Sequence, residues 1–364
     1  MTTNQYRNHG MAGPRGMQGV SLIELMIAML LGLVVVAAAG GLFLTNKRVY
    51  ASTETLNRIQ ENTRSSFEIM SRDVREAGGR VCGSSSQLVN MLKSKDSAWW
   101  ASFGQGLRGY DNAEAAPGTA TGSGAAQRAN GTDAIDLHLA NDGGHAVVEH
   151  KTPSATLDLD STDGLAAGDI AMVCNTSYSL IFQISGLNAN GVLHNGGGSA
   201  PGNCGQEFQF ENPANCAGAS NPYGYCMMGN TSAQCVKAST EPAVLVKVGT
   251  IRWYIGNNGR GGRSLYRASV TNRTMGATPD LVDPVEIAEG ISDMQLEYRS
   301  LGGAGFVAAS AVADWSTVNA VRIRLTAEGV EGALGGNYIE GTDGNALSRD
   351  VTHVVAVRNR EGVL

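Results

Sequence analysis

Hydrophobic residues form one long run near the N-terminus, and a single charge interrupts it. Residues 20–44 contain no charged side chain except Glu24. About 20 apolar residues suffice to cross a bilayer, so the run predicts a membrane-spanning helix. A carboxylate in the middle of such a helix costs about 2.5–3.5 kcal/mol on insertion scales. Glu24 is therefore expected either to lie near the membrane surface or to meet a partner.

A second helical pattern follows the apolar run. Its less polar positions recur at spacings of three and four, the pattern of an amphipathic helix: Leu56, Ile59, Thr63, Phe67, Met70, Val74 and Ala77. No proline occurs in residues 20–79, and Gly78-Gly79 supplies a stop. We therefore predict one continuous helix, with a membrane-spanning half at 20–44 and an amphipathic half at 45–79.

Beyond Gly79 the apolar pattern changes to a period of two, which is typical of strands. Strands are predicted at residues 135–139, 170–173, 180–184, 244–255, 264–267, 294–298, 321–325 and 351–357. The glycine-rich stretch 256–262 predicts a hairpin turn between two of them. One helix followed by a series of strands predicts an α+β fold, in which the amphipathic helix packs on a mainly antiparallel sheet.

Residues 80–364 are long enough for one β-rich domain with inserted loops. Loops are predicted near 101–131, which is rich in Gly, Ala, Thr and Asn, and near 186–242. Long loops on a scaffold often carry recognition. Whether these two do so, or are plain surface, stays open at the level of sequence.

The cysteines indicate an exported, disulfide-bonded chain. There are six, none in a CxxC pair: Cys82, Cys174, Cys204, Cys216, Cys226 and Cys235. An even number without zinc-ligand spacing favours disulfides. Two bridges within residues 204–235 would staple a loop that lacks an apolar stripe. A bridge from Cys82 to Cys174 would tie the helix end to the sheet, although fifteen pairings are formally open.

Charge and motifs narrow the possible functions. The net charge is −6, and no basic stripe supports nucleic-acid binding. The chain contains no G-x-S-x-G, no H-E-x-x-H and no P-loop, so we expect no enzyme activity, no catalytic residues, no cofactor and no metal site.

Several isolated residues have ordinary structural explanations. We expect five dispersed histidines to be surface or hydrogen-bonded residues: His138, His145, His150, His194 and His353. Residues 158–164 hint at calcium, but they fail the EF-hand template and predict a turn. For Trp99 and Trp100 we expect one buried and one partly covered side chain.

The N-terminus allows two interpretations. Ala37-Ala38-Ala39 is similar to a signal-peptidase site, but the apolar core of a signal peptide is about 7–15 residues long and uncharged. Gly19 followed by Val20-Ser21-Leu22-Ile23-Glu24 and the apolar run instead resembles a type IV prepilin. Val20 and Ser21 depart mildly from the family's usual Phe and Thr. Met11 and Met17 are alternative starts of the leader.

The resemblance implies a processing pathway. A leader at 1–19 would be cleaved after Gly19 by the prepilin peptidase, and Val20 would become the methylated N-terminus. Glu24 would then set the assembly register by meeting the N-terminal amine of a neighbouring subunit. A buried carboxylate recovers much of its desolvation cost from such an ammonium partner.

The part of the chain after the apolar run resembles the PilW class of minor pilins, in short blocks spread over most of its length. The similar blocks are residues 67–83, 168–185, 253–267, 285–299 and 321–360. The resemblance implies a minor pilin that primes or caps type IV pilus assembly and supports twitching motility and surface attachment. The implied partners are other minor pilins, the major pilin, the inner-membrane assembly platform, a tip adhesin, and membrane lipid before assembly, with no nucleic acid.

The implied location is the inner membrane with a periplasmic domain, and later the pilus, at its tip. Two alternatives stay open. One is the J-class minor pseudopilin of type II secretion, which shares the long helix and a sheet-rich domain. The other is a membrane-tethered periplasmic binding protein, which would need no cleavage at Gly19.

Overall fold

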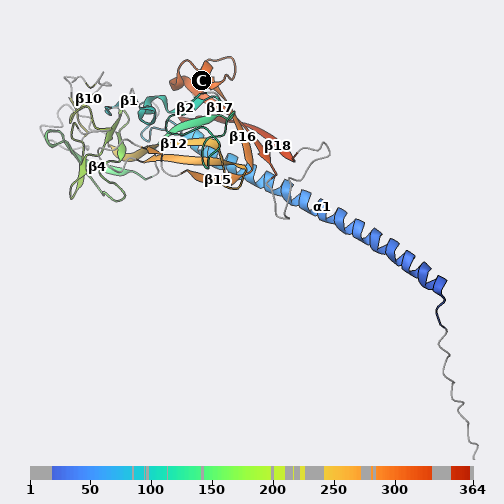
Figure 1. Ribbon diagram of the computed structural model, residues 1–364. Coiled ribbons are helices and arrows are strands. Elements are labelled where there is room, and N and C mark those ends of the chain that lie inside the picture. The colour runs from blue at the N-terminus through green and yellow to red at the C-terminus, as the bar shows by residue number, and fades with distance from the viewer. Residues whose placement is uncertain are drawn as a thin grey trace, which may run out of the picture. The chain divides into compact units, whose positions relative to one another are not determined.

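The structure is a computed structural model. It describes residues 19–83, 86–93, 95, 98–112, 114–140, 143–197, 201–209, 216, 222–225, 242–271, 280–281, 284–329 and 346–360. The chain divides into two compact units, Met1–Glu54 and Thr55–Leu364. Helix α1 (Leu22–Glu76) is continuous through this division, which confirms the single helix predicted from the sequence (Figure 1).

Local capping explains both ends of α1. At its start the Glu24 N–H donates to Ser21 Oγ at 3.2 Å, so Ser21 acts as the N-cap. At its end Gly78 adopts φ +66°, a conformation that glycine takes without strain, and its N–H donates to the His138 carbonyl at 2.8 Å. The helix therefore stops where the chain joins the sheet.

The second unit contains a large sheet built from thirteen described strands. These are β1 (Gln87–Asn90), β2 (Leu107–Tyr110), β3 (Ala134–Ala140), β4 (His145–Lys151), β5 (Thr156–Leu159), β6 (Ile170–Cys174), β7 (Tyr178–Gln183), β8 (Gly186–Leu187), β9 (Gly191–Leu193), β12 (Val244–Asn257), β13 (Arg263–Thr271), β14 (Asp280–Leu281) and β15 (Val285–Glu289). Its main path runs β1-β7-β6-β12-β4-β5-β9-β8.

Two smaller sheets complete the described strands. β16 (Ile291–Ser300), β17 (Val318–Glu328) and β18 (Ser348–Ala356) form a three-stranded antiparallel sheet. β10 (Phe208–Gln209) and β11 (Pro222–Tyr223) form a short pair. Between described strands only β1 and β7 pair in parallel, so the prediction of a mainly antiparallel sheet is confirmed.

Strand β12 joins the two ends of the large sheet. Its first residues pair with β4 and β6, and its remaining residues pair with β3 and β13. At 14 residues, β12 is long enough to pair with strands at both ends of the sheet. Each end has its own buried cluster: one lies beneath α1 and the three-stranded sheet, and another lies around β5, β6, β7 and β9.

The amphipathic half of α1 packs into the first of these clusters. Ile59, Met70 and Val74 are buried there with residues of both sheets, including Trp253 and Ile323. The predicted packing of this helix on the sheet is therefore confirmed. Burial of whole aliphatic and aromatic side chains is the dominant favourable contribution to such a contact.

Each predicted strand overlaps an observed strand, with 180–184 and 351–357 each ending one residue beyond it, and other strands were missed. Part of the predicted loop at 101–131 forms β2 and two short 3₁₀ helices, η1 (Trp99–Ala101) and η2 (Phe103–Gln105). Strand β4 escaped prediction because a bulge between Val147 and Glu149 and the buried polar residue His150 break its alternation. In the predicted loop at 186–242, the structure places β8, β9, β10 and β11, and many of its residues lie outside the described ranges.

Candidate functional site

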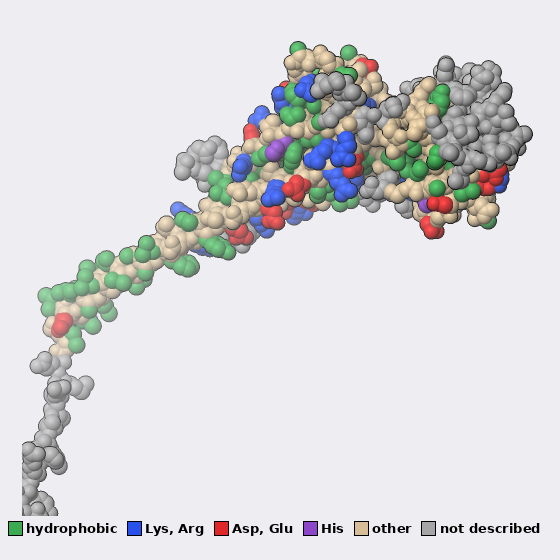
Figure 2. Space-filling view, turned by 180° about the vertical axis from the view of Figure 1, so that it is seen from behind, with side chains coloured by type: hydrophobic (Ala, Val, Ile, Leu, Met, Phe, Trp, Pro, Cys, Tyr) green, Lys and Arg blue, Asp and Glu red, His purple; other side chains and the backbone are tan. Residues whose placement is uncertain are grey.

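The N-terminal half of α1 presents an apolar surface. Every residue from 19 to 50 is exposed, and the large hydrophobic ones include Leu30, Leu33 and Val36. Figure 2 shows hydrophobic side chains along the visible face of this part of the helix. Among the described helices, α1 is long and apolar enough to cross a membrane. A surface of this extent is typical of a segment that contacts lipid or a protein partner.

Glu24 lies in the first turn of this apolar helix. With Ser21 as N-cap, Glu24 occupies the third helical position, the S-x-x-E spacing of a capping box. The positive end of the helix dipole favours a carboxylate there. Glu24 therefore has a local role at the helix start besides the assembly role predicted for it. The spacing of Ser21 and Glu24 was a sequence signal for this cap.

The predicted cleavage point precedes the helix. Gly19, Val20 and Ser21 have no regular secondary structure, and a Cβ atom added to Gly19 would meet no atom within 4 Å. Val20 is 68% exposed. An exposed segment without regular secondary structure is suited to entering a protease site. The leader residues before Gly19 lie outside the described ranges.

Asp73 fixes the other half of α1 to the sheet. Its Oδ2 accepts from Trp253 Nε1 at 3.0 Å and from Arg267 Nε at 2.9 Å. Trp253 is fully buried, so water cannot reach its indole N–H. The bond to Asp73 supplies the acceptor that this N–H needs. Sequence reasoning assigned no role to Asp73, because a carboxylate within an amphipathic helix is ordinarily solvent-exposed.

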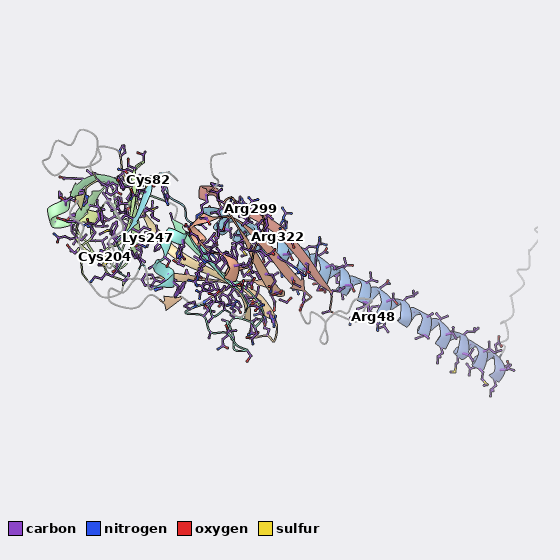
Figure 3. All side chains as sticks on the ribbon, turned by 90° about the horizontal axis from the view of Figure 1, so that it is seen from above. Arg48, Cys82, Cys204, Lys247, Arg299 and Arg322 are labelled. Carbon is purple, nitrogen blue, oxygen red and sulfur yellow. A yellow bond between two sulfur atoms is a disulfide. The ribbon has the colours of Figure 1, made fainter. Side chains whose placement is uncertain are left out.

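A disulfide holds the segment after α1. The structure joins Cys82 to Cys174 on β6, the pairing that we expected, and Cys204 to Cys216. Figure 3 shows Cys82 and Cys204 in the same part of the second unit. Cys226 and Cys235 lie outside the described residues.

Arg360 links the segments on either side of it through hydrogen bonds. Its guanidinium bonds to the carbonyls of Gln105, Trp315 and Val318. A Cβ atom at Gly78 would approach the Cα of Gly106 to 3.3 Å. The helix end, the β2 region and the end of the chain therefore converge at one point.

A buried ionic network lies under the predicted 101–131 loop. Arg252 contacts Asp136 through Nε and Nη2 at 2.6 and 2.8 Å, and Tyr110 donates to the same carboxylate at 2.8 Å. Arg128 is also buried and donates to the carbonyls of Tyr110, Asp111, Glu114 and Thr132. Burial raises the pKa of Asp136, while Arg252 acts against that shift. These arginines give the loop a polar anchor that no hydrophobic pattern could reveal.

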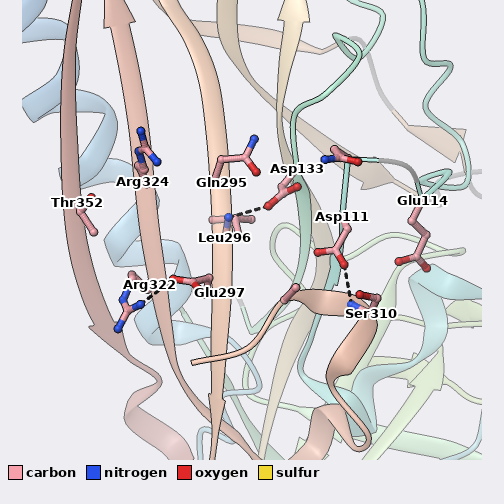
Figure 4. A pocket seen from close by; sticks show the side chains of 12 residues that line it. Asp111, Glu114, Asp133, Gln295, Leu296, Glu297, Ser310, Arg322, Arg324 and Thr352 are labelled. Atoms are coloured by element: carbon pink, nitrogen blue, oxygen red, sulfur yellow. Dashed lines mark hydrogen bonds and ion pairs between the residues drawn. The ribbon is translucent and has the colours of Figure 1, made fainter. Parts of the chain in front are cut away.

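A polar groove of about 970 Å³ opens beside the three-stranded sheet (Figure 4). Carboxylates line one side, and the arginines of β17 line the other: Asp111, Glu114 and Asp133 opposite Arg322 and Arg324. Most of these charges already have partners. Arg322 pairs with Glu297 at 2.7 Å, and Glu114 pairs with Arg108 at 3.1 Å.

Within this groove Asp133 has a raised pKa. Burial raises the pKa of Asp133 to about 6, and the N–H of Leu296 acts in the opposite direction by donating to its Oδ2 at 2.7 Å. Asp111 caps a short 3₁₀ helix, η6 (Ala309–Ala311), through the N–H groups of Ala309 and Ser310. Most charged groups that line the groove are therefore paired or hydrogen-bonded.

The structure brings two of the five dispersed histidines together. His150 and His194 form a buried pair, whereas His138 bonds to Thr250 and His353 stacks on Phe67. His145 lies 3.9 Å from Asp160. Within the described residues no group of three His, Cys, Asp or Glu side chains could hold a metal ion.

Two smaller predictions also have outcomes. The turn predicted over residues 158–164 is confirmed at Asp163 and Gly164, whereas Asp158 and Leu159 lie on β5, where Lys151 donates to Asp158. Trp100 is 4% exposed, and Trp99 is partly covered by the Arg252 guanidinium 4.2 Å above its ring. The expectation of one buried and one partly covered tryptophan is therefore confirmed.

Two family models match the chain. The model described as type IV pilus-assembly protein W matches residues 252–359, from within β12 to the end of β18 and beyond. The model described as the prokaryotic N-terminal methylation motif matches residues 14–40, which include Gly19, Val20 and Glu24. No curated protein matches the chain, and no solved structure does.

Proposed function

We propose that the chain primes or caps type IV pilus assembly. The two family matches support a PilW-class type IV pilin, and the proposal proceeds from them. In this role it supports twitching motility and surface attachment, and it performs no catalysis. The observation that carries the proposal is Glu24, the single charge in an exposed apolar helix that begins directly after the predicted cleavage point.

Energetics favour a partner for this charge. An unpaired carboxylate is penalised in an apolar bundle, and removal of one member of a buried pair costs more than the pair contributes. After cleavage each subunit has an ammonium group at Val20. Because that group can neutralise Glu24 of a neighbour, the pair favours one axial offset between adjacent helices.

The fold supports the same role. A long helix whose second half packs on a mainly antiparallel sheet agrees with a pilin-like fold. On this proposal the first part of α1 sits in the inner membrane before assembly, and the second unit is periplasmic. The prepilin peptidase, the assembly platform, other minor pilins, the major pilin and a tip adhesin are the partners, and the pilus tip is the final location.

The test separates assembly from folding at Glu24. Glu24→Gln removes the charge but keeps the size, and Glu24→Ala removes both. We expect normal protein level, normal leader cleavage and at least tenfold fewer surface pili in both variants. Glu61→Gln, at an exposed position on the other half of α1, is the matched control and should leave pilus number unchanged.

Two outcomes would contradict the proposal. Normal pilus number in both Glu24 variants would show that the charge has no assembly partner. Loss of a secreted protein, with pili intact, in a strain lacking the chain would assign it to type II secretion instead.

A further inference from the structure

Two buried histidines meet end to end in the second unit. His150 lies on β4 and His194 directly follows β9, and their Nε2 atoms are 3.0 Å apart. Both side chains are at most 1% exposed. Phe182, Phe208 and Tyr225 surround the two rings.

Hydrogen bonding assigns the protons of this pair. The Tyr225 backbone N–H donates to His150 Nδ1 at 3.0 Å, so the proton of neutral His150 must be on Nε2. That proton points at His194 Nε2, which accepts it, and the proton of His194 is therefore on Nδ1, a buried nitrogen without a hydrogen-bond partner among the described residues. Each ring has one nitrogen that could take another proton, and in both rings that nitrogen is already a hydrogen-bond acceptor.

The same assignment argues against a metal site. Two converging imidazole nitrogens resemble a pair of metal ligands, but a ligand must present a bare lone pair. Tyr225 keeps the proton of His150 on the converging nitrogen. Within the described residues no third ligand completes the set.

Among the described residues, no charged group compensates a proton on this pair. Glu149 and Lys151 alternate to the opposite face of β4, where Lys151 bonds to Asp158 of β5. Of the aromatic rings named above, Phe182 lies on β7, Phe208 lies on β10, and Tyr225 follows the end of β11. Burial lowers the pKa of His150 to about 3, and burial together with His150 lowers the pKa of His194 well below its ordinary value. The carbonyls of His194 and Gln206 act in the opposite direction without restoring it.

The pair connects a stapled segment to the large sheet. We define the flap as residues 204–209 and 222–225, which include β10, β11 and the half-cystine Cys204. Phe208 stacks on His194 at 4.1 Å between ring centroids, and the Tyr225 backbone bonds to His150. Both contacts join the flap to β4 and to the end of β9.

We propose that the His150–His194 pair is an acid-operated latch for the flap. A proton added to His194 Nε2 would face the proton of His150 at 3.0 Å, and the hydrogen bond between the rings would become a repulsion. A proton added to His150 Nδ1 would face the Tyr225 N–H in the same way. Either event separates the flap from β4 and β9, while the core beneath α1 stays folded.

The sign of the pH dependence follows from linkage. In the closed state each histidine is neutral, and in the open state its pKa returns to the ordinary value of a solvated imidazole. The open state therefore binds more protons as the pH falls. Closure is therefore unaffected above about pH 7 and weakens as the pH falls below 6.5. The opening constant should rise up to about tenfold per pH unit for each histidine, down to about pH 3.

Hydrogen exchange of the whole mature chain in detergent micelles tests the latch. After correction for intrinsic rates, we expect protection of the flap to fall roughly 30-fold or more between pH 6.5 and 4.5. Protection of β16, β17 and β18 should not change, and return to pH 7 should restore the flap. Constant protection of the flap would overturn the proposal, and so would an equal loss throughout the second unit.

Two variants sharpen the test. His194→Gln keeps a hydrogen-bond acceptor for His150 but cannot titrate, so the pH dependence of opening should become shallower. Tyr225→Phe removes the bonds from its hydroxyl to the carbonyls of Val173 and Tyr178, and should raise opening equally at every pH. An unchanged pH dependence in His194→Gln would contradict the latch, and the wild-type profile decides if that variant fails to fold.

Discussion

The two halves of α1 have the same backbone and opposite surroundings. In the first half Leu30 is 66% exposed, and in the second half Met70 is fully buried. The first half is apolar around its whole circumference, whereas the second has one apolar stripe beside Arg and Glu side chains. A helix that is apolar all round needs lipid or a partner, and an amphipathic helix needs its own domain.

This difference separates two sources of stability. The second half contributes to the folding of the second unit through its buried side chains and through Asp73. Residues 19–50, the described part of this half, are all exposed, so we expect the stability of this half to depend on lipid or a protein partner. Substitutions in the first half should therefore leave the folding stability of the second unit unchanged. Conservative substitutions in the second half should leave membrane insertion and assembly through the first half unchanged.

The largest effect is expected from emptying the core beneath the second half. Met70→Ala should lower the free energy of unfolding of the second unit by about 2–5 kcal/mol, since it leaves a cavity among fully buried residues. Leu30→Ala is the matched control and should not change the unfolding transition. Chemical denaturation of the mature chain in detergent, followed by tryptophan fluorescence, measures both. Equal effects of the two substitutions would remove the distinction between the halves.

The disulfide at the end of α1 should have the next largest effect. Its cysteines are 92 residues apart in sequence, whereas Cys204 and Cys216 are 12 apart. Replacing Cys82 and Cys174 together by Ala should cost about 2–4 kcal/mol, because the bridge restricts a long loop in the unfolded chain. Replacing Cys204 and Cys216 should mainly raise protease sensitivity near the flap. A larger global loss from the second pair would reverse this assignment.

A smaller effect is expected at Asp73. Asp73→Ala leaves the buried indole N–H of Trp253 without its acceptor and should cost about 1–3 kcal/mol. Asp73→Asn keeps an acceptor oxygen and should cost less, and Glu61→Ala on the exposed side serves as control. Thermal unfolding of the three variants measures their loss of stability, which we expect to be largest for Asp73→Ala and smallest for Glu61→Ala. If Asp73→Ala matches the control, Asp73 does not fix the helix to the sheet.

The strands that follow hydrophobic alternation were predictable, and those built on polar burial were not. β16 alternates over residues 292–299 and β17 over residues 321–328, so their positions followed from the sequence. β2 and the segment around Arg128 were assigned to a loop, because carbonyl groups rather than apolar neighbours satisfy that buried guanidinium. Non-local polar contacts such as Arg252 with Asp136, 116 residues apart, have no periodic signal.

The candidate site followed from the sequence at its N-terminal end. Gly19, Val20 and Glu24 were recognised from their spacing, and their roles stay predictions. Asp73 and the His150–His194 pair were not foreseen, because each depends on a contact between distant strands or between helix and sheet. Local sequence could place such residues on an element but could not supply their partners.

The mass of the mature N-terminal peptide tests the central claim most directly. A peptide that begins at Val20 and carries one methyl group is the result we predict for the chain purified from membranes. Replacing Gly19 by a bulky residue should leave the full-length precursor in the membrane. A mature chain that begins at Gly40, after Ala37-Ala38-Ala39, would contradict the account, because the apolar helix and Glu24 would then be removed.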